Sequence, residues 1–266
     1  MSTATIAFRA PTVLENPNFE LLYWVGCAGA YDRRAQRVAR ALVKLLNAAR
    51  VNFAILGCEE KCTGDSARRL GDEFLFQELA RANIATLAKY NVRKIVAHCP
   101  HCVNAFLKDY PQFGGCYEVM HHTQLLAQLV RDGRLTIPGE IPASLHGAVT
   151  YHDPCYLARV NGIHAAPREV LGSALGNGEQ RELREMPHCR EKTFCCGAGG
   201  GRMWMEEDPK QRVSTERARQ ALATGATTVA VGCPFCLTMM TDGVAAQGGE
   251  ARVLDVAEIL AERLGL

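Results

Sequence analysis

The sequence lacks several features that would assign it to a common functional class. Its formal net charge is only +2 and no long run of like charges occurs, so it offers no basic field for binding nucleic acid. No stretch approaches the roughly 18 consecutive apolar residues of a membrane-spanning helix. The first twenty residues lack the basic and then apolar pattern of a secretory signal. We therefore expect a cytoplasmic protein, and peripheral association with a membrane complex remains open.

Cysteine is the residue that the sequence has in excess. Twelve cysteines occur among 266 residues, far more than packing alone requires. Because the cytosol keeps thiols reduced, a framework of structural disulfides is not expected. Metal binding, redox chemistry and burial as small apolar side chains are the remaining uses, and the spacing of the cysteines decides among them.

The cysteines lie at matching positions in two similar halves of the sequence. The segment KIVAHCPHCVNAF at 94–106 resembles TVAVGCPFCLTMM at 228–240, with an offset of 134 residues. The same offset places Cys62 against Cys196, and an offset of 128 places Cys27 against Cys155. Such agreement indicates an internal duplication. We expect an N-terminal arm at 1–20, a first lobe at 21–140 and a second lobe at 141–266, with the boundary in the Pro- and Gly-rich stretch 137–147.

Each half alternates short apolar runs of strand length with amphipathic stretches of helical period. One helix is expected from about Ser66 to Lys89, and another begins at Asp208–Pro209 and ends near Gly225. This alternation predicts an α/β fold of two similar lobes, each with a mostly parallel sheet and flanking helices. The loops after parallel strands meet at one edge of the sheet, so the cysteines should converge there.

Convergence of cysteines from three segments in each lobe predicts an iron–sulfur cluster in each, since such clusters are held by cysteine thiolates, usually four. The predicted ligands are Cys27, Cys62, Cys99 and Cys102 in the first lobe and Cys155, Cys195, Cys196, Cys233 and Cys236 in the second. Gly197 and Gly199 are expected to let backbone amides approach the second cluster.

The residues Cys155, Cys195-Cys196-Gly197 and Cys233-Pro-Phe-Cys236 resemble the cysteine-rich CCG domain. That family includes the B-type and D-type polypeptides of heterodisulfide reductase and the iron–sulfur subunits of glycolate oxidase and anaerobic glycerol-3-phosphate dehydrogenase. The resemblance runs from about residue 21 to the end. It implies a five-cysteine site that can hold a non-cubane [4Fe–4S] cluster in the second lobe.

The first copy departs from the family pattern, because Lys61 stands where the first cysteine of the pair is expected. Its four remaining cysteines suit a cubane [4Fe–4S] cluster, and Cys58 is a candidate replacement ligand. No closely spaced CxxCxxC run of a ferredoxin-like domain is present. The resemblance thus implies partners that supply further redox groups, namely a flavoprotein or other iron–sulfur subunits of a complex.

Other interpretations of the same residues stay open. CPHC after a strand is also typical of a thioredoxin-type dithiol, and paired CxxC motifs can bind zinc. Cys116 and Cys189 match nothing in the other half and are expected to be ordinary thiols, while His152 and Asp153 could tune the second cluster or relay a proton.

Three functions follow from these interpretations. The preferred one is an electron-transfer subunit that works between a flavoprotein and a further redox partner. The second is a catalytic subunit that reduces a heterodisulfide or handles a thiol, and the third is an iron-free dithiol or zinc protein. No catalytic residue is assigned at this point.

Overall fold

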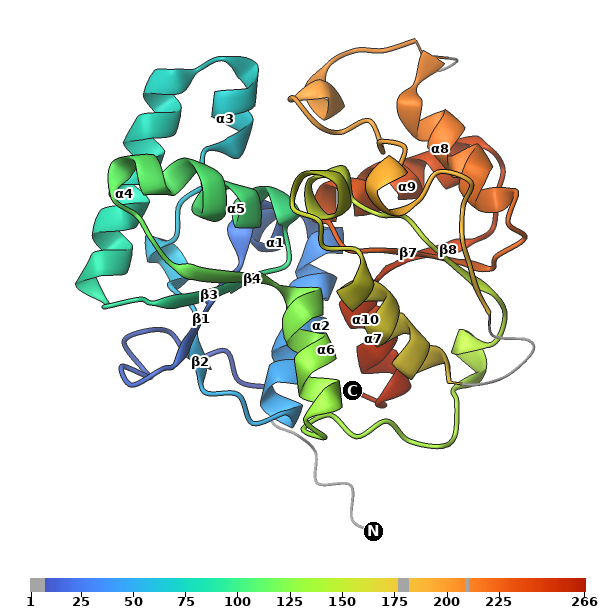
Figure 1. Cartoon of the computed structure of the whole chain (residues 1–266), viewed down its shortest axis with the longest axis horizontal. Coiled ribbons are helices and arrows are strands. Elements are labelled where there is room, and N and C mark those ends of the chain that lie inside the picture. Colours follow the sequence, from blue (N-terminus) through green and yellow to red (C-terminus); the bar gives the residue numbers. More distant parts are fainter. Residues whose placement is uncertain (1–7, 177–181, 209–210) are drawn as a thin grey trace.

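The protein consists of two similar lobes, each built on one parallel four-stranded sheet (Figure 1). The computed structural model describes residues 8–176, 182–208 and 211–266. The first sheet has the order β2-β1-β3-β4 and the second the order β6-β5-β7-β8. The strands are β1 (Leu21–Trp24), β2 (Phe53–Ala54), β3 (Lys94–Ala97), β4 (Glu118–His121), β5 (Val149–Tyr151), β6 (Leu183–Arg184), β7 (Thr228–Val231) and β8 (Arg252–Asp255). The duplicated α/β fold is thereby confirmed.

Helices connect the strands and cover both faces of each sheet. They are α1 (Gly26–Tyr31), α2 (Arg33–Ala48), α3 (Asp65–Leu70), α4 (Glu73–Lys89), α5 (Pro100–Asn104), α6 (His122–Arg131), α7 (Ala165–Leu175), α8 (Val213–Leu222), α9 (Pro234–Ala246) and α10 (Val256–Arg263). Tyr23 pairs with Val96 in one sheet and Tyr151 pairs with Ala230 in the other. The register therefore repeats the offsets of 128 and 134 residues that relate the two halves of the sequence.

The alternation of side chains along each strand divides the interior into three cores. Tyr23 of β1 and Tyr151 of β5 point into a central core that both lobes share with α2, α6, α7 and α10. Trp24 points to the opposite face of the first sheet, where α4 and α5 pack. Val229 and Val231 of β7 point to the corresponding face of the second sheet, under α8 and α9. The two lobes are consequently joined by a common hydrophobic core.

Contacts across this central core follow the duplication. The duplication makes α7 the counterpart of α2 and α6 the counterpart of α10. Helix α2 packs against α10, and α7 packs against α6 in the same way. At the first turns of α6 and α10, His122 Nε2 and Asp255 Oδ1 lie 2.9 Å apart and are fully buried. Asp255 also accepts a hydrogen bond from the Ala257 N–H and so caps α10. The interface between the lobes thus contains a buried polar pair within an apolar core, although His122 Nδ1 and Asp255 Oδ2 have no hydrogen-bond partner among the described residues.

Two predictions for the local structure differ from what is observed. The helix expected at 66–89 is divided, because Gly71 adopts a φ of 93° and Asp72 caps a new helix through the Leu75 N–H. The helix expected to start at Asp208–Pro209 begins at Val213, and Pro209 itself lies outside the described residues. It ends at Leu222, where the Gly225 N–H closes the last turn on the Leu222 carbonyl.

The described part of the N-terminal arm, residues 8–20, packs along the edge of the first sheet. Thr12 bridges Ile55 in parallel orientation, and Val13 is buried. These residues extend the first lobe beside β2 instead of projecting from it.

Candidate metal centre

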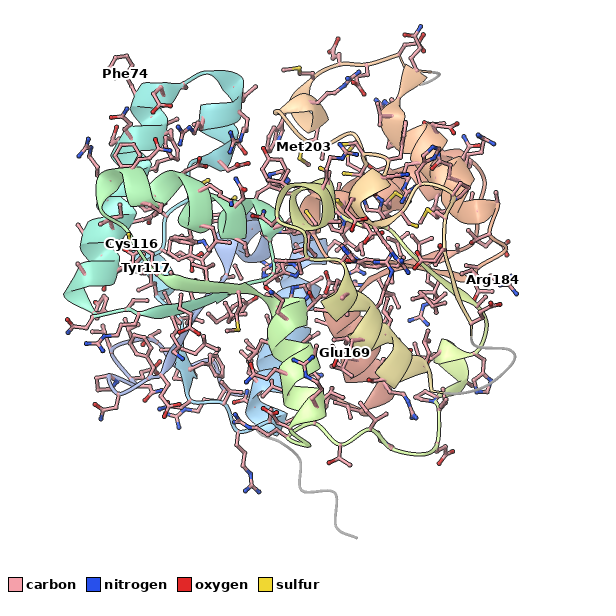
Figure 2. The ribbon with its side chains drawn as sticks, viewed as in Figure 1. Phe74, Cys116, Tyr117, Glu169, Arg184 and Met203 are labelled. Carbon is pink, nitrogen blue, oxygen red and sulfur yellow. The ribbon has the colours of Figure 1, made fainter. Side chains whose placement is uncertain are left out.

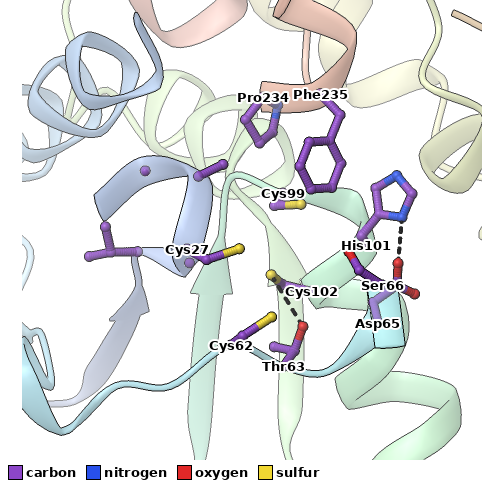
Figure 3. Close-up of a pocket in the computed structure, with 14 residues that line it drawn as sticks. Cys27, Cys62, Thr63, Asp65, Ser66, Cys99, His101, Cys102, Pro234 and Phe235 are labelled. Carbon is purple, nitrogen blue, oxygen red and sulfur yellow. Dashed lines mark hydrogen bonds and ion pairs between the residues drawn. The ribbon is translucent and has the colours of Figure 1, made fainter. Parts of the chain in front are cut away.

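The four cysteines predicted in the first lobe line one small cavity. Cys27 follows β1, Cys62 precedes α3, and Cys99 and Cys102 flank the start of α5. In Figure 3 the sulfur atoms of Cys27, Cys62 and Cys102 face one another, with Cys99 above them. Pro234 and Phe235 of the second lobe complete the wall. Three separate segments of the sequence thus present sulfur atoms to a common space.

The five cysteines predicted in the second lobe also contact one another. The Sγ atoms of Cys196 and Cys236 are 3.3 Å apart. Cys155 lies within hydrogen-bonding reach of Cys195, and Cys233 within reach of Cys236. Cys196, Cys233 and Cys236 are buried, while Cys155 and Cys195 are partly accessible. This lobe therefore gathers one sulfur atom more than the first.

The two cysteine groups adjoin through equivalent positions of the duplication. The thiol of Cys99, the first cysteine of the CPHC motif, interacts with the thiol of Cys233, the first cysteine of CPFC. Each is the N-cap of the helix that follows, with proline in its first turn. The loops after β3 and β7 therefore meet where the lobes touch, and all nine predicted ligands lie in one continuous region.

Hydrogen bonds favour the thiolate form of cysteines in both lobes, including Cys99, whose pKa is lowered by hydrogen bonds from Cys102 and Cys233. The pKa of Cys62 is lowered to about 7, chiefly by the hydrogen bond from Cys27 and also by the Gly64 N–H, which lies 3.4 Å from Cys62 Sγ. The pKa of Cys195 is likewise lowered by hydrogen bonds from Cys155 and Cys196, and the Gly197 N–H lies 3.2 Å from its Sγ. Thiolates are the form of cysteine that ligates metals.

These contacts correct the sequence matching of the CCG segment. The offset of 134 placed Lys61 opposite Cys195 and Cys62 opposite Cys196. In the structure Cys62 makes the contacts of Cys195, and both Gly64 and Gly197 adopt positive φ angles of 83° and 92°.

Thr63 consequently takes the place of Cys196. Its Oγ1 lies 3.7 Å from Cys102 Sγ, as Cys196 Sγ lies 3.3 Å from Cys236 Sγ. The first lobe therefore has Cys62-Thr63-Gly64 where the second has Cys195-Cys196-Gly197, and Lys61 is exposed outside the motif.

The donors present in both groups fit iron–sulfur clusters. They are sulfur atoms from three segments per lobe, four in the first and five in the second, and each group contains a backbone N–H directed at sulfur. A mononuclear metal is the competing fit, since a ring nitrogen of His152 and the Sγ atoms of Cys196 and Cys236 lie within 4.8 Å of one another. Such a site would use only part of the sulfur that the second lobe collects.

Gly197 and Gly199 occupy different surroundings in the second lobe. The Gly197 amide contacts Cys195, whereas a Cβ on Gly199 would meet nothing within 4 Å. The structure thus gives Gly197 a direct contact with a predicted ligand, and it leaves open space where a side chain on Gly199 would lie.

The three remaining cysteines lie outside both groups. Cys58 and Cys116 are exposed, and Cys116 lies at the outer side of the first lobe (Figure 2). Cys189 is partly buried beside Glu185. None of the three lines the cavity of the first lobe.

Sequence reasoning missed two acidic residues that organise the first group. Glu60 accepts hydrogen bonds from the N–H groups of Val25 and Gly26, and it thereby ties the segment of Cys62 to that of Cys27. Burial raises the pKa of Glu60 to about 7. Asp65 Oδ2 lies 2.8 Å from His101 Nδ1 at the start of α3.

An aromatic contact beside this pair also escaped the sequence analysis. The His101 ring stacks on Tyr156 of the second lobe at 4.2 Å between centroids and meets Phe235 edge-on. The only feature of the sequence that points to this contact is the histidine between the two cysteines of CPHC. No pattern in the sequence predicts that residue 101 contacts residue 156.

The geometry and the duplicated motif place the chain in a known family. Its sequence matches the cysteine-rich domain family named CCG over residues 21–106 and again over 149–241, and the chain belongs to this family. The resemblance drawn from the motif is thereby confirmed.

Relatives with curated descriptions cover nearly all of this chain. It is 48% identical over 250 residues to "Probable iron-sulfur-binding oxidoreductase FadF" of Bacillus subtilis. The aligned region covers 93% of this chain and 34% of that protein. It is 45% identical to "EtfAB:quinone oxidoreductase" of Syntrophomonas wolfei, over 92% of the chain and 34% of that protein. The chain thus spans about a third of the length of these two relatives.

A third relative belongs to a different complex. The D polypeptide of dihydromethanophenazine:CoB–CoM heterodisulfide reductase from Methanosarcina barkeri is 35% identical, over 98% of this chain and 63% of that polypeptide. No helix among the described residues is long and apolar enough to cross a membrane.

Proposed function

We propose that this chain is the iron–sulfur part of an oxidoreductase and relays electrons between a flavoprotein and a further redox partner. The observation that carries the proposal is the contact of Cys99 with Cys233, which makes neighbours of the two cysteine groups. Iron–sulfur clusters exchange single electrons at potentials that their surroundings set. Two such groups on adjoining thiols are suited to passing electrons through the protein.

The ligands in this proposal are the nine cysteines predicted from the sequence, with Cys27, Cys62, Cys99 and Cys102 in the first group. Four thiolates suit a cubane [4Fe–4S] cluster, and the complete CCG motif of the second group suits a non-cubane one. Gly197 supports the second group through its N–H, and Gly199 stays a predicted point of backbone approach to that group.

The partner assignment rests on the relatives. EtfAB:quinone oxidoreductase carries an electron-transferring flavoprotein and a quinone in its name, and this chain is 45% identical to it. We therefore propose an electron-transferring flavoprotein or a flavin dehydrogenase as the donor. We place the protein in the cytoplasm, where its thiols are kept reduced, with docking on a membrane complex in keeping with a quinone acceptor.

The test is reduction of the protein by a flavoprotein. Protein purified without oxygen is mixed with chemically reduced electron-transferring flavoprotein, and cluster reduction is followed by electron paramagnetic resonance. Stoichiometric reduction of iron–sulfur signals supports the relay. A protein that holds iron but accepts no electrons from any reduced flavoprotein contradicts it.

A second candidate function is reduction of a heterodisulfide, and the 35% identity to the D polypeptide of heterodisulfide reductase favours it. In that case a disulfide substrate would reoxidise the reduced protein with release of two thiols. Reoxidation by a disulfide but not by a quinone analogue would replace the relay with this function. Zinc in place of iron, or titratable dithiols without metal, would replace both with the third candidate.

A further inference from the structure

The second cysteine group has a histidine beside it that no ligand motif contains. His152 directly follows β5 and is fully buried, and its backbone N–H pairs with the Ala230 carbonyl of β7. A ring nitrogen of His152 lies within 4.8 Å of both Cys196 Sγ and Cys236 Sγ. The position of His152 at the end of β5 therefore holds the imidazole close to the predicted second site.

The hydrogen bonds of His152 determine which ring nitrogen carries the proton. Arg217 Nε donates to His152 Nδ1 across 2.9 Å. A guanidinium group only donates, so Nδ1 accepts and the proton of the neutral ring lies on Nε2. Among the described residues, Nε2 is a buried atom without a hydrogen-bond partner. A buried N–H without a partner is costly, and the adjacent sulfur group is the acceptor that would satisfy it.

Arg217 itself is a buried cation without a paired carboxylate. It lies on α8, is fully buried, and has no carboxylate oxygen within 4.0 Å among the residues that the structure describes. Its Nη1 donates to neutral acceptors, the His188 carbonyl and Gln220 Oε1, and its Nη2 has no partner. Because a buried unpaired charge is strongly unfavourable, a nearby anionic group is expected. Asp153, which is already paired with Arg168, supplies part of that charge, and the thiolates of Cys236 and Cys196 in the second group supply more.

The first lobe has neutral residues at both equivalent positions. The offset of 128 that relates β1 to β5 places Trp24 opposite His152, and both residues are fully buried. The offset of 134 places Asn83 of α4 opposite Arg217 of α8. Asn83 is also fully buried, but it donates to the Cys62 carbonyl and to Tyr110 and carries no charge. At this position the second lobe therefore carries a buried positive charge and the first lobe does not.

We propose that His152 and Arg217 act as a pair that raises the reduction potential of the second cluster above that of the first. The inference rests on the proposed function, because it requires a cluster in each lobe. Nε2–H of His152 donates to a sulfur atom of the second group, and the guanidinium of Arg217 stabilises added negative charge. Hydrogen bonds to sulfur and local charge are among the factors that set such potentials. A single electron added to the protein then resides on the second site.

The test is a redox titration of both clusters, followed by electron paramagnetic resonance, in protein purified without oxygen. His152→Leu and Arg217→Met should each lower the potential of the second cluster and leave the first unchanged. We expect a change of about tenfold in the ratio of reduced to oxidised second cluster at a fixed ambient potential, which for one electron is a shift of about 59 mV. His152→Gln places an amide N–H in the same region and should restore most of the potential.

The matched control is Trp24→Phe, which removes the indole N–H at the equivalent position and should leave the potential of the second cluster unchanged. Unchanged potentials in His152→Leu and Arg217→Met with full iron content would overturn the proposal. Loss of the second cluster in His152→Leu and its retention in His152→Gln would assign His152 to assembly and also overturn it. Absence of iron from the wild-type protein would instead refute the proposed function, so the two failures are distinguishable.

Discussion

Thr63 of the first lobe occupies the position that Cys196 occupies in the second. Thr63 lies between Cys62 and Gly64, and Cys196 lies between Cys195 and Gly197; in both cases the glycine N–H donates to the cysteine sulfur. Each of the two residues also contacts the second cysteine of the CxxC motif in its lobe. Threonine in place of cysteine at this position gives the first lobe four cysteines and the second lobe five.

Replacing Thr63 with cysteine should complete the first motif. Thr63 is buried and its Oγ1 already lies 3.7 Å from Cys102 Sγ, so a cysteine sulfur would reach the same cavity without a change of backbone. We expect the electron paramagnetic resonance spectrum of the first site to become like that of the second, with iron content unchanged. Thr63→Ser keeps the hydroxyl group and should leave the spectrum as it is. A Thr63→Cys protein with the wild-type spectrum would show that a fifth cysteine here does not determine the cluster type.

Replacing Cys196 with serine should remove the second cluster and leave the first. Cys196 contacts Cys195 and Cys236 but no cysteine of the first group, whereas Cys233 contacts Cys99. We expect about half of the iron to be lost on metal analysis, and Cys189→Ser, the control, to lose none. Loss of all iron in Cys196→Ser would indicate that the two sites do not assemble independently.

Cys58 is expected to be dispensable for metal binding. It is exposed and does not line the cavity of the first lobe, although it precedes Cys62 by only four residues. Cys58→Ser should have the iron content and spectra of the wild type, as should the matched surface variant Cys116→Ser. A loss of iron confined to Cys58→Ser would make Cys58 a ligand and the present ligand set incomplete.

The polar contact between the lobes should contribute measurably to stability. Asp255→Ala removes the cap of α10 and leaves the buried His122 Nε2 without its partner, and together these losses should lower the free energy of unfolding by about 2 to 4 kcal/mol. Urea unfolding under anaerobic conditions measures this free energy. Glu118→Gln, which breaks the exposed pair with Lys94, should change it by less than about 0.5 kcal/mol. Equal effects of the two substitutions would show that the contact is not stabilising.

Much of the architecture could be predicted from the sequence, because the duplication appears in local patterns. The strands before Cys27, Cys99, Cys155 and Cys233 are short apolar runs, and their parallel arrangement places the following loops at one edge of each sheet. The CCG segment was matched wrongly by one residue, because the offset of the CxxC motifs was carried into a loop of different length. Only the contacts of Gly64 and Thr63 reveal the correct alignment.

The relation between the lobes could not be predicted from the sequence. The contact of Cys99 with Cys233 depends on the packing of α2 against α10 and of α6 against α7, which no local pattern encodes. The pairing of His152 with Arg217 joins a strand end to a helix 65 residues later. Both residues are of types that are usually exposed, so their burial beside the cysteines becomes evident only in three dimensions.

The central claim is that the two cysteine groups hold two iron–sulfur clusters, and counting the metal tests it most directly. Iron and acid-labile sulfide per chain are measured on protein purified without oxygen, together with its electron paramagnetic resonance spectrum. The account predicts about eight irons and about eight sulfides per chain, as expected for two four-iron clusters, with two distinguishable signals on reduction. Zinc, or no metal with free dithiols, would contradict it.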